Sequence, residues 1–511
     1  METSPSAAQT FAWSKWIFFA AASMVIGIPI VFIHPSNLNQ DTYQYLSIAN
    51  AYFKSEHWRI RDVHTVGPVL PALLALIKGA LPRACRFNAD CDVLIVKFVA
   101  FACYASIGLS AMVYSKARSS SWSAVPLAIA LMFFALPHEK DVYSLNGELL
   151  CGALLAVFIT VASHPTLSRL RLSILTFIAL CVLYTKLQAI LLLALAYWTG
   201  VEKGQRHRAF AWFGGGLVIA ELIFLFAGGG WLLKAAALFT YVVHGQATST
   251  LAPSQSASVY TRLAEHLAHL WWTLSRAWWY FPACAIAMLC AFRRSTANNG
   301  RSLFAMWLLV TVFTIYLPGR EYFHYLLFVI PILFVYLPLA VREIPLEAPR
   351  HWCAGTVIAG LVVVKFCALM PSSDLFAGER IWHIFPAQTI SADADAVKRS
   401  LSLSADDTLF VHGWDFRFYS YFGKAAIGPE LAFVDQGSMS PDDYIRQLVA
   451  SRPTYIIDVV NHSGLIRRTD LALAAVPKWS QAVQSNYEKV YDHNGLVVYR
   501  RRAVTQALPS T

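Results

Sequence analysis

AWSKWIFFAAASMVIGIPIVFIHPSNLNQDTYQYLSIANAYF (residues 12–53) joins a long apolar run to a polar, aromatic segment. The apolar part, residues 12–33, is long enough to cross a bilayer, which takes about 20 residues. His34-Pro35-Ser36 follows it directly, with no small-residue cleavage site, so the run predicts a retained span rather than a signal peptide. Beyond it, apolar and aromatic side chains at helical spacing predict a helix in the membrane interface: Tyr45, Ile48, Ala49 and Tyr52.

Similar apolar runs continue through the first 371 residues and predict about eleven transmembrane helices. They lie near 12–33, 93–114, 122–137, 149–163, 171–185, 187–200, 209–229, 268–291, 302–317, 323–341 and 352–370. A further apolar segment, 65–82, is predicted to lie at the membrane surface. Of the 511 residues, 57% are hydrophobic and 14% are charged, against about 25% charged in an average soluble protein. This composition excludes a disordered or fibrous chain and argues against a soluble enzyme.

The net charge of +11 belongs entirely to this apolar part. Basic residues gather in every second connection between the predicted spans, and most acids lie in the others, including outer loops 34–92 and 136–148. By the positive-inside rule, this asymmetry predicts a cytoplasmic N-terminus and places residues 372–511 on the outer side. The chain shows no basic stripe interleaved with base-stacking aromatics, so we expect no nucleic-acid partner.

From Ser372 onward, charged residues become more frequent and the long apolar runs stop. DTLFVHGW (407–414) and TYIIDVV (454–460) predict buried strands, with helices predicted at FRFYSYFGK (416–424) and PDDYIRQLVASRP (441–453). Two strand-like runs around Asn494-Gly495 predict a hairpin. The order predicts a small α/β domain in residues 372–511, and neither a dinucleotide-binding nor a Walker motif occurs in it.

Polar residues at the outer boundary of the spans are candidates for chemistry. Asp41 follows the first span, at the start of the predicted interfacial helix, where the helix dipole stabilises a carboxylate. This aspartate is either a helix N-cap or a catalytic carboxylate. Glu139, Asp141 and Glu148 lie in LPHEKDVYSLNGELL (136–150), and Glu148 opens a span. Ionisable groups at such depth are usually functional, although an acid at a helix start can also be structural.

Three basic side chains could bind an anion at the same boundary. Arg320 and His324, in YLPGREYFHYLLFVIP (316–331), are four residues apart at the start of a span. The fork of an arginine matches phosphate oxygens, although such a residue can also snorkel to the interface. Lys186 lies between two apolar runs and is either a phosphate ligand or a loop lysine.

Cys85 and Cys91 lie six residues apart in a short loop that is predicted to be outside. An oxidising periplasm would allow them to form a local disulfide. The other cysteines lie at apolar span positions, and no Cys-x-x-Cys pair suggests zinc.

Three segments resemble the GT-C glycosyltransferases, the membrane enzymes that use polyprenyl-phosphate sugars. They are QDTYQYLSIANAYF followed by GPVLPALLALIKG, the acidic loop ending at Asn146-Gly147-Glu148, and REYFHYLLFVIPIL. The C-terminal segments also resemble the outer domain of bacterial members. The likeness covers nearly the whole chain, but its motifs are short and identify a superfamily rather than a substrate.

The resemblance implies an inverting transfer at the outer face of a bacterial inner membrane. Asp41 corresponds to the family's catalytic base, and Arg320, His324 and Lys186 would bind the donor phosphate. Glu148, Asp141 and Glu139 could hold a divalent Mg²⁺, Mn²⁺ or Ca²⁺ with Asp41, as in some members, or form part of an acceptor site. Partners would be a polyprenyl-phosphate-linked sugar, membrane lipids, and a glycan, lipid or protein acceptor.

Two other classes of protein remain possible from the sequence. A transporter would carry polar groups at mid-span and repeated halves. Glu221, Lys97 and Lys365 lie inside predicted spans, but no matching pair of broken segments is visible. A membrane-anchored sensor would use the outer domain for binding, although eleven spans exceed what an anchor needs. The sequence names neither the sugar nor the acceptor.

Overall fold

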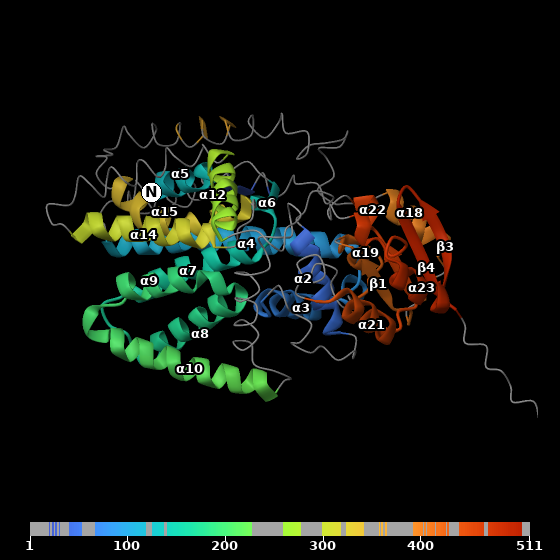
Figure 1. Ribbon diagram of the computed structural model, residues 1–511. Coiled ribbons are helices and arrows are strands. Elements are labelled where there is room, and N and C mark those ends of the chain that lie inside the picture. The colour runs from blue at the N-terminus through green and yellow to red at the C-terminus, as the bar shows by residue number, and fades with distance from the viewer. Residues whose placement is uncertain are drawn as a thin grey trace, which may run out of the picture.

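The computed structural model describes the chain in segments. They are residues 40–53, 67–118, 125–136, 140–226, 259–276, 299–317, 323–341 and, with short gaps, 392–502, together with isolated positions in 20–30 and 357–364. Two parts are visible: a helical part built from described residues up to position 341 and a smaller part that contains a sheet (Figure 1).

The helical part is built from long apolar helices and shorter connecting ones. The α-helices are α2 (Gln40–Ala51), α3 (Val69–Ala80), α4 (Ala89–Arg118), α5 (Val125–Ala135), α6 (Lys140–Tyr143), α7 (Gly147–Ala162), α8 (Arg169–Thr185), α9 (Ile190–Gly200), α10 (Arg206–Phe226), α12 (Val259–Arg276), α14 (Asn299–Tyr316) and α15 (Ile330–Val341). The 3₁₀ turns are η3 (Arg83–Cys85), η4 (Leu187–Ala189), η5 (Lys203–Gln205) and η7 (Phe323–Val329).

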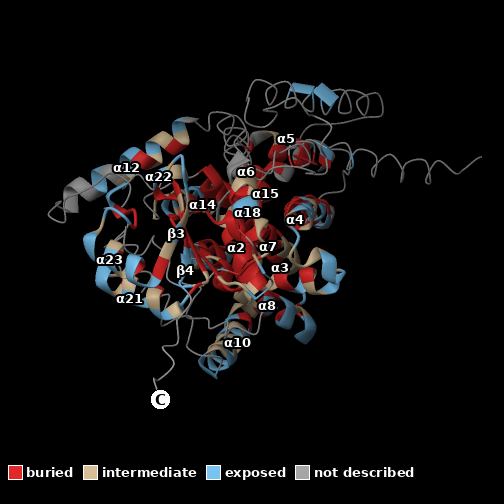
Figure 2. Ribbon diagram, turned by 90° about the vertical axis from the view of Figure 1, so that its right-hand side faces the viewer, coloured by how far each residue is buried: buried red, intermediate tan, exposed pale blue. Residues whose placement is uncertain are grey.

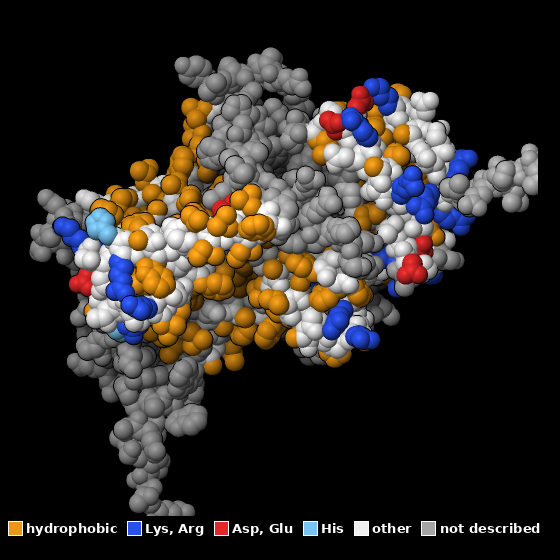
Figure 3. All heavy atoms as spheres, turned by 90° about the horizontal axis from the view of Figure 1, so that it is seen from below, with side chains coloured by type: hydrophobic (Ala, Val, Ile, Leu, Met, Phe, Trp, Pro, Cys, Tyr) orange, Lys and Arg blue, Asp and Glu red, His pale blue; other side chains and the backbone are white. Residues whose placement is uncertain are grey.

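Several of these helices expose large apolar side chains that a water-soluble protein would bury. Phe226 is 91% exposed, and Phe98, Leu170 and Phe177 are also largely exposed. Hydrophobic side chains cover the middle of the helical part, while lysines and arginines gather at its end remote from the C-terminal domain (Figure 3). Such an apolar surface between polar ends fits contact with lipid. The fold is therefore a polytopic membrane domain followed by a C-terminal domain.

Fewer helices of the structure have the length and composition of a membrane span than the eleven spans that the sequence predicts. Among the described residues, only the helices Ala89–Tyr114 and Lys203–Phe226 are long and apolar enough to cross a membrane by themselves. Of five shorter apolar helices, four lie at or near predicted spans, and the fifth, Val69–Ala80, lies in the segment 65–82 that is predicted to lie at the membrane surface. The predicted break at Lys186 separates α8 from η4 and α9. The predicted spans 12–33 and 352–370 lie largely outside the described residues, so the count of eleven stays a prediction.

Two predicted spans start differently in the structure. The helix expected at 268–291 begins nine residues earlier, at Val259, and crosses the direction of its neighbours (Figure 1). The sequence of α12, VYTRLAEHLAHLWWTLSR, is strongly amphipathic, which makes this helix unsuited to the bilayer core. The span expected at 323–341 begins as the 3₁₀ segment η7 and becomes α-helical only at Ile330.

The C-terminal domain is built on a four-stranded sheet. Its strands are β1 (Leu409–His412), β2 (Tyr455–Asp458), β3 (Tyr487–His493) and β4 (Leu496–Arg501), in the order β1-β2-β4-β3. β1 and β2 are parallel, and the other two pairs are antiparallel. The helices are α18 (Ala392–Ser400), α19 (Arg417–Tyr421), α21 (Pro441–Ser451), α22 (Val460–Ser463) and α23 (Pro477–Asn486), with the turn η8 (Thr469–Leu471).

Each strand and helix that the sequence predicts here has a counterpart in the structure, which adds the helix α18 before β1. Asn494 and Gly495 both have positive φ, 49° and 77°, as a two-residue hairpin turn requires. The strands predicted at 407–414 and 454–460 contain β1 and β2, and α21 begins at a Ser440 N-cap followed by Pro441. The predicted boundary between residues 371 and 372 lies outside the described residues.

The two faces of the sheet pack on different partners. Leu409, Val411 and Ile457 belong to the same apolar core as the helices of the membrane domain. The alternate residues Phe410 and Ile456 belong to a separate core with side chains of α21 and α23. This alternation follows from the two-residue period of a strand. The sheet thus faces the helical part directly, and α2 and α7 lie buried at the centre of the molecule (Figure 2).

The loop before α4 forms part of this contact. The structure joins Cys85 and Cys91 in a disulfide, with their Cα atoms 5.4 Å apart. Phe87, inside the closed loop, lies against Gly423 at the end of α19, where a Cβ would be only 2.6 Å from the Phe87 carbonyl oxygen.

Candidate active site

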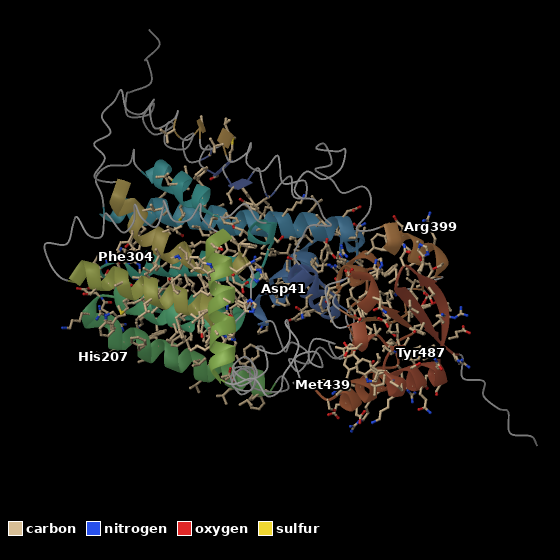
Figure 4. The ribbon with its side chains drawn as sticks, turned by 45° about the horizontal axis from the view of Figure 1, so that its top comes forward. Asp41, His207, Phe304, Arg399, Met439 and Tyr487 are labelled. Carbon is tan, nitrogen blue, oxygen red and sulfur yellow. A yellow bond between two sulfur atoms is a disulfide. The ribbon has the colours of Figure 1, made fainter. Side chains whose placement is uncertain are left out.

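Asp41 lies in the first turn of α2, as the sequence predicts, and its side chain is partly exposed. The residues that follow it along α2, from Thr42 to Asn50, are all buried. Thr42 Oγ1 donates a hydrogen bond of 2.6 Å to the carbonyl oxygen of Leu145. This bond ties the start of α2 to the loop before α7. In Figure 4, Asp41 lies between α12 and the C-terminal domain.

The start of α7 holds the second acid. Asn146 caps this helix, because its side-chain oxygen accepts a hydrogen bond of 2.7 Å from the Leu149 backbone N–H. Glu148, in the first helical turn, is fully buried. Since the cap is Asn146, Glu148 is not needed for that role, and an isolated buried carboxylate would be costly. Its charge must be balanced by a neighbour.

Lys186 is that neighbour. It follows the last residue of α8 and its Nζ lies 2.8 Å from Glu148 Oε1. His324, at the start of η7, is also buried, with Nε2 4.0 Å from the same oxygen. Tyr325 packs against the His324 ring, with ring centroids 4.8 Å apart. Segments that are far apart in the sequence thus meet at the end of α7.

A glycine makes this close packing possible. A Cβ at Gly147 would lie 2.7 Å from Cε of Lys186 and 3.3 Å from Oη of Tyr45. Any larger residue would push the lysine away from Glu148. Gly147 therefore allows the ammonium group to lie directly over the start of α7.

The charge state of Lys186 follows from its neighbours. Burial lowers its pKa, but the carboxylates of Glu148 and Asp41 raise it, and the net pKa is well above the ordinary value of a lysine. Lys186 is thus protonated at neutral pH. Asp41 also interacts electrostatically with Tyr45, one turn further along the same face of α2.

Four of the residues that the sequence singles out therefore lie in one cluster: Asp41, Glu148, Lys186 and His324. We call this set the α2–α7 cluster. Arg320 and Glu139 lie outside the described residues, as does the side chain of Asp141, whose backbone belongs to α6. Their roles stay predictions.

The described residues do not by themselves fit a divalent metal. No group of three or more His, Cys, Asp or Glu among them could hold an ion. Glu148 is already neutralised by Lys186, and Asp41 is the other carboxylate of the cluster. A metal would therefore need Glu139 or Asp141.

Sequence reasoning overlooked Tyr45 and Gly147 as parts of this site. Tyr45 could have been found, because it lies four residues after Asp41 and so on the same helix face. Gly147 gives no comparable signal, since its requirement arises from Lys186, 39 positions away. Sequence reasoning also overlooked a buried polar cluster on the other face of α2.

Comparison with known proteins gives a match in fold. The sequence matches no protein-family model and no curated protein. Among solved structures, ArnT from Cupriavidus metallidurans in the apo state aligns with 97% of this chain and 98% of its own, at 14% identity and a TM-score of 0.51.

Two further solved structures align at lower TM-scores. ArnT from Cupriavidus metallidurans bound to undecaprenyl phosphate gives 0.48 at 14% identity, over 96% of this chain and 98% of its own. The archaeal oligosaccharyltransferase AglB from Archaeoglobus fulgidus, in complex with an inhibitory peptide and a dolichol-phosphate, gives 0.46 at 12% identity, over 98% of this chain and 75% of its own. The apo ArnT match extends over both parts of the chain, so the order of membrane domain and C-terminal domain is shared.

Proposed function

We propose that this chain, a membrane protein with the GT-C glycosyltransferase fold, transfers a sugar from a polyprenyl-phosphate donor to an acceptor. The observation that carries the proposal is the α2–α7 cluster. It combines a partly exposed carboxylate, a protonated lysine and a histidine at one end of the membrane domain, beside the C-terminal domain. These are the groups that such a transfer needs.

In this mechanism Asp41 is the general base. Its carboxylate takes the proton of an acceptor hydroxyl while the hydroxyl oxygen attacks the anomeric carbon of the donor. The bond between that carbon and the phosphate oxygen breaks on the opposite side, so the configuration inverts, and its electron pair leaves with the polyprenyl phosphate. A carboxylate is a weak base for a hydroxyl, so accurate placement of Asp41 supplies much of the rate.

Lys186 and His324 would bind the phosphate of the donor. A phosphate monoester or diester is a stable anion, so the leaving group needs cations rather than a strong acid. Lys186 is held at the boundary by Glu148, which keeps it charged and oriented before the donor arrives. Arg320, in the sequence just before His324, would complete the phosphate site.

The proposed location is the inner membrane of a bacterium, with the N-terminus in the cytoplasm and the C-terminal domain in the periplasm. The distribution of basic residues over the predicted connections supports this orientation. The acceptor is a glycan, lipid or protein, and the sugar is a hexose or a pentose.

The decisive experiment follows labelled sugar from polyprenyl phosphate. Purified protein in liposomes is incubated with a panel of undecaprenyl-phosphate sugars and with membranes that contain acceptors. We expect label to move into an acceptor fraction, and Asp41→Asn to lower the rate by at least about 100-fold, because it removes the base. Asp442→Asn is a matched control, since Asp442 is an exposed acid of the C-terminal domain.

Two results would contradict the proposal, and a third would add a metal to it. A folded Asp41→Asn protein that transfers sugar at the normal rate excludes Asp41 as the base. Loss of transfer in EDTA, restored by Mg²⁺ or Mn²⁺, would show that the transfer needs a divalent metal, for which the described residues alone provide no site. Liposomes that take up solute without consuming any lipid-linked sugar would indicate a transporter. Glu221, an acid inside a predicted span, accepts a hydrogen bond of 2.6 Å from Tyr184.

A further inference from the structure

A second buried polar cluster lies on the opposite side of α2 from Asp41. It consists of Asn50 at the end of α2, Lys78 in α3, Asp92 in the first turn of α4, and Ser420 in α19 of the C-terminal domain. We call these four residues the α2 latch. All four are fully buried. Nothing in the proposed chemistry uses them.

Polar atoms of the latch pair with one another across four elements. Lys78 Nζ donates to Asp92 Oδ1 and, at 2.6 Å, to Asn50 Oδ1. The other carboxylate oxygen of Asp92 accepts a hydrogen bond of 2.7 Å from Ser420 Oγ. The amide of Asn50 donates at 3.2 Å to the carbonyl oxygen of Lys424. Two of these bonds cross from the membrane domain to the C-terminal domain.

Stability alone does not explain such a cluster. The desolvation of a buried ion pair offsets much of its attraction, and apolar side chains of similar volume often serve as well. What a fully paired polar cluster supplies is orientation, because each bond is directional and an unmade bond is costly. The latch therefore fixes how α2, α3, α4 and α19 lie relative to one another.

The two faces of α2 connect the latch to the α2–α7 cluster. Asp41 and Asn50 are nine residues apart, which places them about 14 Å apart along the helix and about 180° around it. Asp41 and Tyr45 interact with Lys186 on one face. On the opposite face, Tyr43 interacts electrostatically with Asp92 and with Arg417 of α19. A rotation or shift of α2 at the latch thus moves Asp41.

We propose that the α2 latch positions Asp41, so that contact with the C-terminal domain, through Ser420 and the Lys424 carbonyl, sets the catalytic geometry. Asn50, Lys78, Asp92 and Ser420 are positioning residues in this inference, which rests on the proposed role of Asp41. The C-terminal domain then acts on the transfer through α2, in addition to any contact it makes with the acceptor.

Two variants test the latch by different routes. Ser420→Ala removes one bond from the C-terminal domain and leaves the Lys78–Asp92 pair intact. Lys78→Met with Asp92→Leu removes both charges together, so that no buried charge is left unpaired. We expect each to lower kcat by at least about tenfold, since small misplacements of a reacting group are costly, with donor KM unchanged within about twofold. Lys478→Met, which breaks an exposed pair with Asp442, is the matched control and should leave kcat unchanged.

A cycle with Asp41→Asn separates positioning from general damage. If the latch acts through Asp41, Ser420→Ala lowers the residual rate of Asp41→Asn by less than about twofold. If Ser420→Ala lowers the transfer rate by the same factor with Asp or Asn at position 41, the substitution does not act through Asp41 and the inference is wrong. An unchanged kcat in both latch variants also overturns it.

Hydrogen exchange of α2 provides a readout that needs no substrate. We expect the amides of α2 to exchange faster in both latch variants, while those of α21 and α23 stay as in the unchanged protein. If α2 responds in this way but the protein without substitutions transfers no sugar, the proposed function is wrong, while the conclusion that the α2 latch holds α2 in place stands. If exchange of α2 does not change, the latch does not hold this helix and the inference fails whatever the activity.

Discussion

Gly147 shows how little space the α2–α7 cluster leaves. An added Cβ would lie 2.7 Å from Lys186 Cε, closer than real Cβ contacts allow, so the lysine would have to move. We therefore expect Gly147→Ala to lower transfer by about tenfold or more, through displacement of Lys186. It should also lower the free energy of unfolding by about 1–3 kcal/mol. Rate assays and thermal melts measure the two effects.

Gly214→Ala is the control for this substitution. Gly214 lies inside α10, and nothing comes within 4 Å of a Cβ built there. Because alanine favours a helix over glycine, this variant should be as stable or slightly more stable and should transfer sugar normally. A Gly147→Ala protein that behaves like Gly214→Ala would show that Lys186 does not need its present position.

The Lys186–Glu148 pair permits a test that separates stability from function. Lys186→Met leaves Glu148 buried without its partner, so we expect the free energy of unfolding to fall by about 3 kcal/mol. Adding Glu148→Gln removes the stranded charge and should restore most of that stability. Transfer should stay low in the double variant, because the phosphate-binding cation is still missing. Recovery of transfer together with stability would mean that Lys186 is only structural.

At the scale of elements, the contact between α19 and the loop 85–91 depends on Gly423. This residue has φ of +61°, and a Cβ there would lie 2.6 Å from the Phe87 carbonyl oxygen. A non-glycine residue costs about 1–2 kcal/mol in that conformation, before the overlap is counted. We expect Gly423→Ala to loosen the contact, seen as faster hydrogen exchange in residues 85–91 and in α19.

Gly204→Ala is the matched control, since a Cβ at Gly204 meets nothing within 4 Å. If exchange in residues 85–91 is the same in the Gly423→Ala and Gly204→Ala proteins, Gly423 does not hold the two elements together. The disulfide between Cys85 and Cys91 should limit how far the loop moves, because it closes a short ring around Phe87.

At the scale of the whole molecule, the same disulfide tests the orientation. If loop 85–91 lies outside the cytoplasm, an impermeant maleimide applied to spheroplasts should add to Cys85 and Cys91 only after reduction. We expect two adducts more than in a Cys85→Ser, Cys91→Ser protein. Adducts that form without reduction would show that the two cysteines are not joined in a disulfide. Adducts that form only after the cells are permeabilised would place the loop on the cytoplasmic side and reverse the proposed topology.

The arrangement of the molecule follows in part from simple patterns along the chain. Long apolar runs and a polar, alternating C-terminal part predict a membrane domain followed by an α/β domain, and the observed elements agree. Hairpin and strand signals are local, so they can be identified in a single stretch of sequence, as at Asn494-Gly495. The helix α12 departs from prediction because hydrophobicity alone did not reveal its polar face.

The sequence by itself determined the class of the protein and nominated Asp41, Glu148, Lys186 and His324 as separate candidates. Only the tertiary structure decided that Lys186 pairs with Glu148, that Gly147 leaves space for it, and that Lys78 and Asp92 join Ser420, more than 300 positions away. The physical reason is the range of the interactions. Hydrophobic periodicity and capping act between near neighbours in the chain, whereas buried charges find their partners through packing, which the order of residues does not display.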